Sequence, residues 1–204
     1  MKNKVISFLI ALMVLSVTTV AASRTKLVQD FLVRSVYLQD GTKGIQKANN
    51  YRISTYTDIT WTNFMGKGIA MHKKVVVPLK CVEKEIKNTC SGEYIPQVLS
   101  GWRTRNTIKG HEISSHVFGI AIDIDPALNP CCGCVAEGGW QDVPRCKNAQ
   151  TFEDGSAPLG DYEIPQCWIK SFEKYGWYWL GEDPTLRDTM HFEFLAKPGT
   201  ISCE

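Results

Sequence analysis

Eight cysteines in 204 residues constrain this chain more than any other feature of its sequence. Thiols in that number are typical of proteins that form disulfides in an oxidising compartment, or of proteins that bind metal ions. The count is even, which suits complete pairing. The positions are Cys81, Cys90, Cys131, Cys132, Cys134, Cys146, Cys167 and Cys203.

The N-terminus favours the oxidising compartment. Lys2 and Lys4 form a short basic region, Val5–Leu15 is apolar and uncharged, and Val20–Ala22 offers small residues at a cleavage position. This order predicts a secretory signal peptide over residues 1–22 and a secreted or periplasmic protein. The alternative is an uncleaved membrane anchor. We expect no stable anchor, because the apolar run is shorter than the about 20 residues of a transmembrane helix.

In an exported protein the cysteines are expected to form up to four disulfides. The spacing Cys131-x-x-Cys134 can also bind zinc, but export favours disulfides. Eight cysteines allow 105 connectivities, so the sequence does not choose among them. Cys81 with Cys90, which bracket a short helical stretch, is one pairing that we consider.

Charge excludes one class of partner. Cleavage after Ala22 leaves residues 23–204, in which 21 basic residues balance 21 acidic residues. A neutral chain is not drawn to an anionic polymer, so we expect no nucleic-acid partner. The sequence contains no repeat and no Pro/Ser-rich linker, which indicates a single domain, and we expect a monomer.

Hydrophobic periodicity indicates an α+β fold, with helices packed on a small, mostly antiparallel sheet. Residues 44–76 give no clear pattern. Residues 127–160 are rich in Gly, Pro and Cys and predict a long irregular loop. The predicted helices cover residues 26–38, 78–87 and 164–175, and the predicted strands cover residues 94–100, 117–125 and 190–195.

Two of these strands carry side chains that suit a metal ion. His116 precedes one predicted strand, and Asp123 lies on the polar face of that strand. His191 lies on another predicted strand, on the face opposite to that of Phe192. Two imidazoles and a carboxylate make a three-ligand zinc site that leaves a fourth position to water. A nearby carboxylate must then move the proton, and Asp188 is the candidate. Residues 188 and 191 face opposite ways in an extended strand, so this assignment requires a bend.

The motif Ser-x-His-x-x-Gly-x-Ala-x-Asp from Ser114, followed by Asp-x-x-His-Phe-Glu from Asp188, resembles the D-alanyl-D-alanine carboxypeptidase and L-alanyl-D-glutamate peptidase family of zinc metallopeptidases. Phage endolysins and vancomycin-resistance dipeptidases belong to that family. The segments Asp123–Pro130 and Tyr175–Trp179 resemble its endolysin-like branch. Together the matching motifs extend from about residue 100 to residue 194.

The resemblance implies a role for particular residues of this chain. The zinc ligands fall on His116, Asp123 and His191, with one Zn²⁺ per chain, and the general base falls on Asp188. In the segment Gly101-Trp102-Arg103, the arginine binds substrate and stabilises charge on the scissile carbonyl. Ser114 and Trp102 are candidate substrate contacts.

Some roles stay open. Asp125 and Glu193 are rival bases, and Glu193 is also placed to hold an imidazole in position. Arg105 is the nearest substitute for Arg103. Trp102, Trp177 and Trp179 fit either a substrate groove or the core. For the remaining histidines, His72 and His111, we favour a structural role.

The function implied is that of a secreted zinc-dependent peptidase that hydrolyses stem-peptide bonds of peptidoglycan. The endolysin-like segments favour an L-alanyl-D-glutamate endopeptidase. A D-alanyl-D-alanine carboxypeptidase or dipeptidase is the alternative within this family. A catalytically inactive zinc-containing domain, used for binding or signalling as in hedgehog proteins, is an alternative of another class. Cytosolic and phage members of the family do not usually carry so many cysteines.

Overall fold

The structure is a computed structural model, and it describes residues 58–92, 94–103, 114–134, 144–147, 152–197 and 199–203. The predicted signal peptide, the predicted helix 26–38, Arg105 and His111 lie outside the described residues. The described part is α+β with small antiparallel sheets, which confirms the predicted fold class. None of its helices is long and apolar enough to cross a membrane.

Residues 44–76, which gave no clear pattern, include a β-hairpin. Strand β1 (Ile59–Phe64) pairs antiparallel with strand β2 (Lys67–His72). Met65 and Gly66 connect them, and both have positive φ angles, of 48° and 81°. Two central residues with positive φ form the turn that matches the twist of paired strands. Burial alternates along both strands, but the exposed face carries Trp61, which is 78% exposed, so apolar and polar residues do not alternate in the sequence of β1.

The second sheet has the order β3-β4-β6-β5, and every neighbouring pair is antiparallel. Its strands are β3 (Leu99–Ser100), β4 (Ala121–Ile124), β5 (Trp177–Trp179) and β6 (His191–Phe194). Strands β4 and β6 confirm the middle of two predicted strands. His116 lies before β4 as expected, but in a short 3-10 helix, η2 (Ser115–Phe118), which ends at Gly119 in the left-handed conformation.

The predicted strand 94–100 forms only over its last two residues, as β3. The backbone N–H groups of Gln97 and Val98 donate instead to the carboxylate of Asp125, at 2.8 and 2.6 Å. A side chain therefore takes the donors that a neighbouring strand would have used. Short-range patterns do not reveal such a partner, because it lies 27 or 28 residues away.

Among the described residues, two helices pack beside the sheet. Helix α2 (Lys73–Thr89) begins before the predicted start at Pro78, because His72 caps it with a hydrogen bond from the Lys74 N–H to its Nδ1. Helix α4 (Gln166–Lys174) matches the prediction for residues 164–175 closely. A third helix, α3 (Pro144–Lys147), and the short 3-10 helix η4 (Leu180–Glu182) interrupt the irregular segments.

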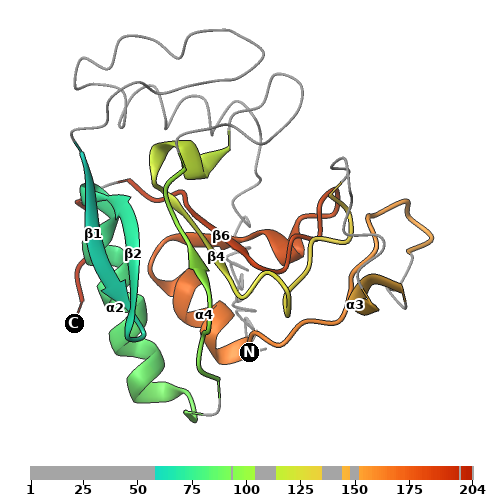
Figure 1. The fold of residues 1–204 in the computed structure, drawn as a ribbon, viewed down its shortest axis with the longest axis horizontal. Helices are drawn as coiled ribbons and strands as arrows, with labels where there is room; N and C mark the ends of the chain where they lie inside the picture. Colours follow the sequence, from blue (N-terminus) through green and yellow to red (C-terminus); the bar gives the residue numbers. More distant parts are fainter. Residues whose placement is uncertain are drawn as a thin grey trace, which may run out of the picture.

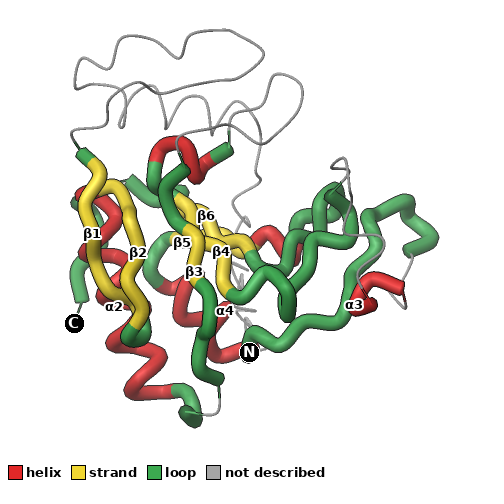
Figure 2. The backbone as a smooth tube through the Cα atoms, viewed as in Figure 1, coloured by secondary structure: helices red, strands yellow, loops and turns green. Residues whose placement is uncertain are grey.

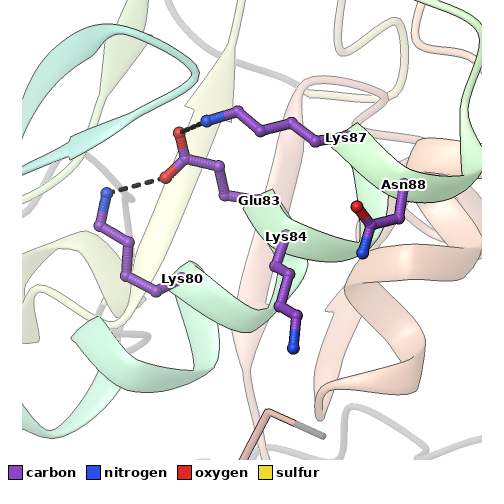
Figure 3. A pocket seen from close by; sticks show the side chains of 5 residues that line it. All are labelled: Lys80, Glu83, Lys84, Lys87 and Asn88. Carbon is purple, nitrogen blue, oxygen red and sulfur yellow. Dashed lines mark hydrogen bonds and ion pairs between the residues drawn. The ribbon is translucent and has the colours of Figure 1, made fainter.

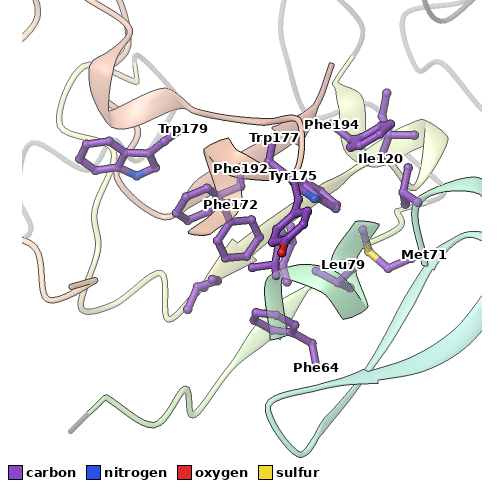
Figure 4. Packing of buried hydrophobic residues seen from close by; sticks show 14 of the residues in the cluster. Phe64, Met71, Leu79, Ile120, Phe172, Tyr175, Trp177, Trp179, Phe192 and Phe194 are labelled. Atoms are coloured by element: carbon purple, nitrogen blue, oxygen red, sulfur yellow. The ribbon is translucent and has the colours of Figure 1, made fainter. Parts of the chain in front are cut away.

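The hairpin and α2 lie at one side of the molecule, and α3 lies at the opposite side, with β4 and β6 between them (Figure 1). Strands β3, β4, β5 and β6 gather at the centre, while loop segments extend toward α3 (Figure 2). The core between α2, α4 and the sheet combines aliphatic side chains with many aromatic rings (Figure 4). Phe172 of α4 stacks on Phe192 of β6, with ring centroids 4.1 Å apart. This packing fixes the face of β6 that is opposite to His191.

All eight cysteines are paired, as Cys81–Cys203, Cys90–Cys167, Cys131–Cys134 and Cys132–Cys146. These four close pairs are compatible with the expected disulfide bonding, but the suggested pairing of Cys81 with Cys90 is wrong. Both residues belong to α2 and its C-terminal cap. Nine residues of helix separate their Cα atoms by about 13 Å, and a disulfide needs less than about 7 Å.

We predict that His72 makes the stability of the fold depend on pH. Burial, with Lys73 and Lys74 nearby and despite Asp58, lowers the pKa of His72 from 6.5 to about 4. The unfolded chain binds a proton below about pH 6.5, whereas the folded chain does not until about pH 4. The contribution of neutral His72 is therefore complete above pH 6.5 and is lost as the pH falls through this window.

The measurement is the melting temperature of the metal-free protein from pH 7.5 to 4, compared with His72→Asn. Asparagine keeps a capping acceptor and does not titrate. We expect a shallower fall in melting temperature for the variant. Equal slopes in the two proteins would contradict the role of His72.

Candidate metal centre

Three side chains that are far apart in the sequence meet at one point. His116 comes from η2, Asp123 from β4 and His191 from β6, and all three are buried. Asp123 Oδ1 lies 2.9 Å from His116 Nε2 and 2.9 Å from His191 Nδ1, and the two nitrogens are 3.1 Å apart. Antiparallel pairing places Asp123 opposite His191. The three predicted ligands are thus brought together.

The outer nitrogen of each imidazole faces an acceptor. His116 Nδ1 lies 2.6 Å from the carbonyl oxygen of Gly101, and His191 Nε2 lies 3.6 Å from Glu193 Oε2. A carbonyl or a carboxylate only accepts, so a neutral imidazole at either position carries its proton on the outer nitrogen. The inner nitrogens, His116 Nε2 and His191 Nδ1, then offer lone pairs to the space beside Asp123.

Gly101 can supply this carbonyl because it has no side chain. A Cβ atom at this position would lie 2.3 Å from the carbonyl oxygen of Ala70, in the neighbouring hairpin. The Trp102 N–H donates to that same Ala70 oxygen at 2.8 Å. The glycine therefore lets the chain approach β2 closely and turn its carbonyl group to His116.

The three inward atoms fit a divalent metal ion. A tetrahedral zinc ion with bonds of about 2.0–2.1 Å holds pairs of ligand atoms about 3.3 Å apart. The separations of 2.9, 2.9 and 3.1 Å approach this spacing. Two lone pairs and a carboxylate oxygen at such distances repel one another unless a positive charge lies among them. The donor set of two imidazoles and one carboxylate is also one that zinc accepts.

The pKa values of the three clustered side chains also favour a positive charge among them. Burial lowers the pKa of His116, which favours its neutral form. For Asp123, burial alone would raise the pKa, but the two histidines hold it below its ordinary value. For His191, burial alone would lower the pKa, but Asp123, Glu193 and Asp188 raise it. The carboxylates therefore favour a positive charge at His191, which either a proton on its ring or a bound metal ion would supply.

Glu193 is fully buried and lies behind His191. The Ser115 hydroxyl donates to Glu193 Oε2 at 2.6 Å, and the same oxygen faces the outer nitrogen of His191. Both contacts suit a carboxylate that holds an imidazole in position better than one that acts on a substrate. Ser115 was missed in the sequence because its partner lies 78 residues away.

Arg103 borders the three-ligand cluster. Its backbone N–H donates to the carbonyl oxygen of His116 at 3.1 Å, and its Nη2 atom lies 3.9 Å from Asp123 Oδ2. The side chain remains 33% exposed. A guanidinium group is therefore held at the edge of the cluster, partly open to solvent.

Asp188 does not join the three inward atoms. Its carboxylate groups instead with the sulfur atoms of Cys131 and Cys134, all within 4.8 Å of one another. The His191 N–H donates to the carbonyl oxygen of Asp188 at 3.3 Å across a turn, and β6 begins only at His191. The bend required between residues 188 and 191 is thus present. The negative charge of Asp188 also helps to raise the pKa of His191, after the larger contributions of Asp123 and Glu193.

Asp125, the other rival base, is occupied elsewhere. Its carboxylate accepts the N–H groups of Gln97 and Val98 and the hydroxyl of Tyr94. Its backbone φ angle is 43°, in the left-handed region. These bonds join the segment before β3 to the end of β4, which is a structural role.

Two further candidate groups have structural contacts. Ser114 caps η2 and accepts the N–H of His116 at 3.4 Å. Trp177 and Trp179 are buried in the core, and the Trp179 indole donates to the carbonyl oxygen of Thr189 at 2.9 Å. Trp102 is half-buried beside Arg103. A substrate contact for Ser114 or Trp102 stays a prediction.

A surface pocket lies away from this centre, along α2 (Figure 3). Lys80 and Lys87 form ion pairs with Glu83 there, at 2.7 and 2.8 Å. Its lining residues are Lys80, Glu83, Lys84, Lys87 and Asn88, and none of them belongs to the three-ligand cluster. The pocket is a charged helix surface.

Residues 107–194 match the model of a protein family described as D-alanyl-D-alanine carboxypeptidase. This range contains His116, Asp123, Asp188 and His191, and it confirms the resemblance indicated by the two motifs. The match supports a peptidase that acts on peptidoglycan. Comparison with curated proteins and with solved structures gave no significant match.

We predict that Ser115→Ala destabilises the protein by about 1.5–3 kcal/mol, because it removes a hydrogen bond to a buried carboxylate. Ser171→Ala is the matched control, since that buried hydroxyl donates only to the carbonyl oxygen of Cys167 in its own helix. Its cost should stay near about 1 kcal/mol. Urea unfolding measures both changes, and equal costs would contradict a larger contribution from the bond between Ser115 and Glu193.

Proposed function

We propose that this chain is a secreted zinc-dependent peptidase that hydrolyses stem-peptide bonds of peptidoglycan. The observation that carries the proposal is the convergence of three buried ligand atoms, His116 Nε2, Asp123 Oδ1 and His191 Nδ1, within 3.1 Å of one another. The family match over residues 107–194 supports the substrate class. Arg103, at the border of the cluster, and Asp188, just before β6, supply the groups that hydrolysis needs.

The metal ion would be held by His116 Nε2, Asp123 Oδ1 and His191 Nδ1, as one Zn²⁺ per chain. The carbonyl group of Gly101 holds the imidazole of His116 through its outer nitrogen, at 2.6 Å, and the carboxylate of Glu193 faces the outer nitrogen of His191 at 3.6 Å. When bound, zinc would lower the pKa of a water molecule to about 7 and polarise the scissile carbonyl. The protein then has to move a proton and to stabilise a negative charge.

We assign proton transfer to Asp188. Its carboxylate accepts a proton from the attacking water and returns it to the leaving amine. Its place just before β6, with a turn to His191, keeps it near the cluster without making it a ligand. Arg103 stabilises the negative charge that develops on the substrate oxygen, because its guanidinium group is anchored beside Asp123 and partly exposed.

The endolysin-like segments favour cleavage between L-alanine and D-glutamate. The description of the matching family favours a second candidate, a D-alanyl-D-alanine carboxypeptidase. In that case Arg103 would be suited to the terminal carboxylate of the stem peptide. The two activities use the same metal centre. They differ in which peptide bond of the substrate is bound next to the metal ion.

We also infer that the protein is exported as a single domain of residues 23–204 and acts as a monomer. Four disulfides in the described residues are compatible with an oxidising, extracellular setting. The predicted signal peptide, residues 1–22, would direct this export.

We predict that purified residues 23–204 hydrolyse peptidoglycan fragments, that a chelator abolishes turnover, and that Zn²⁺ restores it. Mass spectrometry of the products separates the candidates: a stem peptide that begins with D-glutamate marks the endopeptidase, and free D-alanine marks the carboxypeptidase. Asp188→Ala should lower kcat about 10²–10⁴-fold with unchanged zinc content.

Folded, zinc-loaded protein that cleaves neither bond would sink this function and favour a hedgehog-like binding domain. Unchanged turnover in Asp188→Ala would remove Asp188 from the mechanism while leaving the peptidase function in place.

A further inference from the structure

The Cys131-x-x-Cys134 motif has no part in the three-ligand cluster, and its position suggests another role. Cys131 and Cys134 are bonded to each other, while Cys132 between them is bonded to Cys146 in α3. The yellow segment of Figure 1 that follows β4 carries three of these cysteines and runs toward α3. The adjacent residues Cys131 and Cys132 therefore belong to two different disulfides, one within the loop and one that joins the loop to α3.

The Cys131–Cys134 disulfide lies against Asp188. Cys131 forms an antiparallel bridge with Asp188, and Cys134 Sγ lies 4.0 Å from Asp188 Oδ2. Both sulfur atoms and a carboxylate oxygen of Asp188 lie within 4.8 Å of one another. The disulfide thus packs against one side of the carboxylate to which we assign proton transfer.

Further contacts tie the same loop to the segment around Asp188. Thr189 donates to the carbonyl oxygen of Pro130 through both its hydroxyl and its N–H, at 2.8 and 3.2 Å. The Gly133 N–H donates to the carbonyl oxygen of Leu186 at 3.1 Å. A Cβ atom at Gly133 would lie 2.3 Å from that oxygen, so the close approach needs glycine. The loop therefore holds the residues on both sides of Asp188.

This disulfide contributes little to holding the whole chain together. Its cysteines are three residues apart, whereas those of the other disulfides are 14, 77 and 122 residues apart. A short loop restrains the unfolded chain less than a long one. Its effect is expected to be local, on the loop and on Asp188.

The two sulfur atoms differ in access. Cys131 is buried, at 1% exposure, and Cys134 is partly exposed. An attacking thiolate therefore reaches Cys134, and Cys131 is the leaving group. Cys131 Sγ lies 3.4 Å from the carbonyl oxygen of Leu186, which can accept the new S–H group.

We propose that the Cys131–Cys134 disulfide is a reducible latch that positions the carboxylate of Asp188, so that reduction by a dithiol lowers turnover and leaves the metal centre intact. The proposal rests on the proposed function, and it adds redox control to it. The ligand cluster is expected to survive, because Asp123 and His191 are held by the pairing of β4 with β6.

The step is a two-electron thiol–disulfide exchange. A thiolate of the dithiol attacks Cys134 Sγ, which breaks the Cys131–Cys134 bond and releases Cys131 as a thiolate that takes up a proton. The second thiolate of the reductant then attacks the mixed disulfide and releases Cys134, which is protonated in turn. The reductant leaves as a disulfide, and both cysteines end as thiols.

The test compares zinc-loaded Cys131→Ser/Cys134→Ser with the wild type and with Cys132→Ser/Cys146→Ser. The latter is the matched control, because it removes the neighbouring disulfide of the same loop. We expect the latch variant to keep one zinc ion and the wild-type KM and to lose kcat by about 10²-fold, since a small misplacement of a catalytic group costs that much. The control should keep its kcat.

The same substitutions in an Asp188→Ala background show whether the latch acts through Asp188. We expect no further loss of kcat there, because a positioning effect disappears with the group that is positioned. An equal loss in both backgrounds, an unchanged kcat in the latch variant, or an equal loss in the control would overturn the proposal.

Redox titration of the wild type tests the latch without any substitution. Graded dithiothreitol should lower kcat in step with alkylation of Cys131 and Cys134, while zinc content stays constant, and reoxidation should restore kcat. Loss of zinc in step with kcat would contradict the latch. A folded wild type without turnover before reduction would overturn the proposed function, and this proposal with it.

Discussion

The antiparallel pairing of β4 with β6 is the interaction on which the rest of this structure depends. It places Asp123 directly opposite His191, and it places Ile122 opposite Phe192 on the other face. A slip of one residue would exchange these faces, so that the polar pair would enter the aromatic core. The stacking of Phe172 on Phe192 makes such a slip costly. The register that builds the core is therefore also the register that builds the metal centre.

A second constraint is the satisfaction of buried polar atoms. Six polar or charged side chains around the centre are almost fully buried: Ser114, Ser115, His116, Asp123, His191 and Glu193. Burial of such groups is costly unless each has a partner. Gly101 and Ser115 supply partners from the outside, and the inner lone pairs remain for a cation. The same bonds that lower the cost of burial also aim the ligands.

The sequence could predict those parts of the fold and the site that depend on local pattern. Helix α4, strand β4 and strand β6 follow their hydrophobic periodicity, and the spacing of the two motifs brings out His116, Asp123 and His191. The features that were missed depend on partners distant in the chain. Ser115 meets Glu193 only after folding, and Asp125 shortens β3 by taking its backbone donors. The pairing of Cys81 with Cys203 spans 122 residues, and no local pattern indicates it.

The measurement that tests the central claim most directly is the zinc content of the folded protein, determined by elemental analysis after gel filtration. The wild type should retain one zinc ion per chain, and Asp123→Ala should retain none while keeping its circular dichroism spectrum. Removal of the carboxylate deletes the one ligand atom that both imidazoles face. A wild type without zinc, or an Asp123→Ala variant with as much zinc as the wild type, would contradict the assignment of this centre.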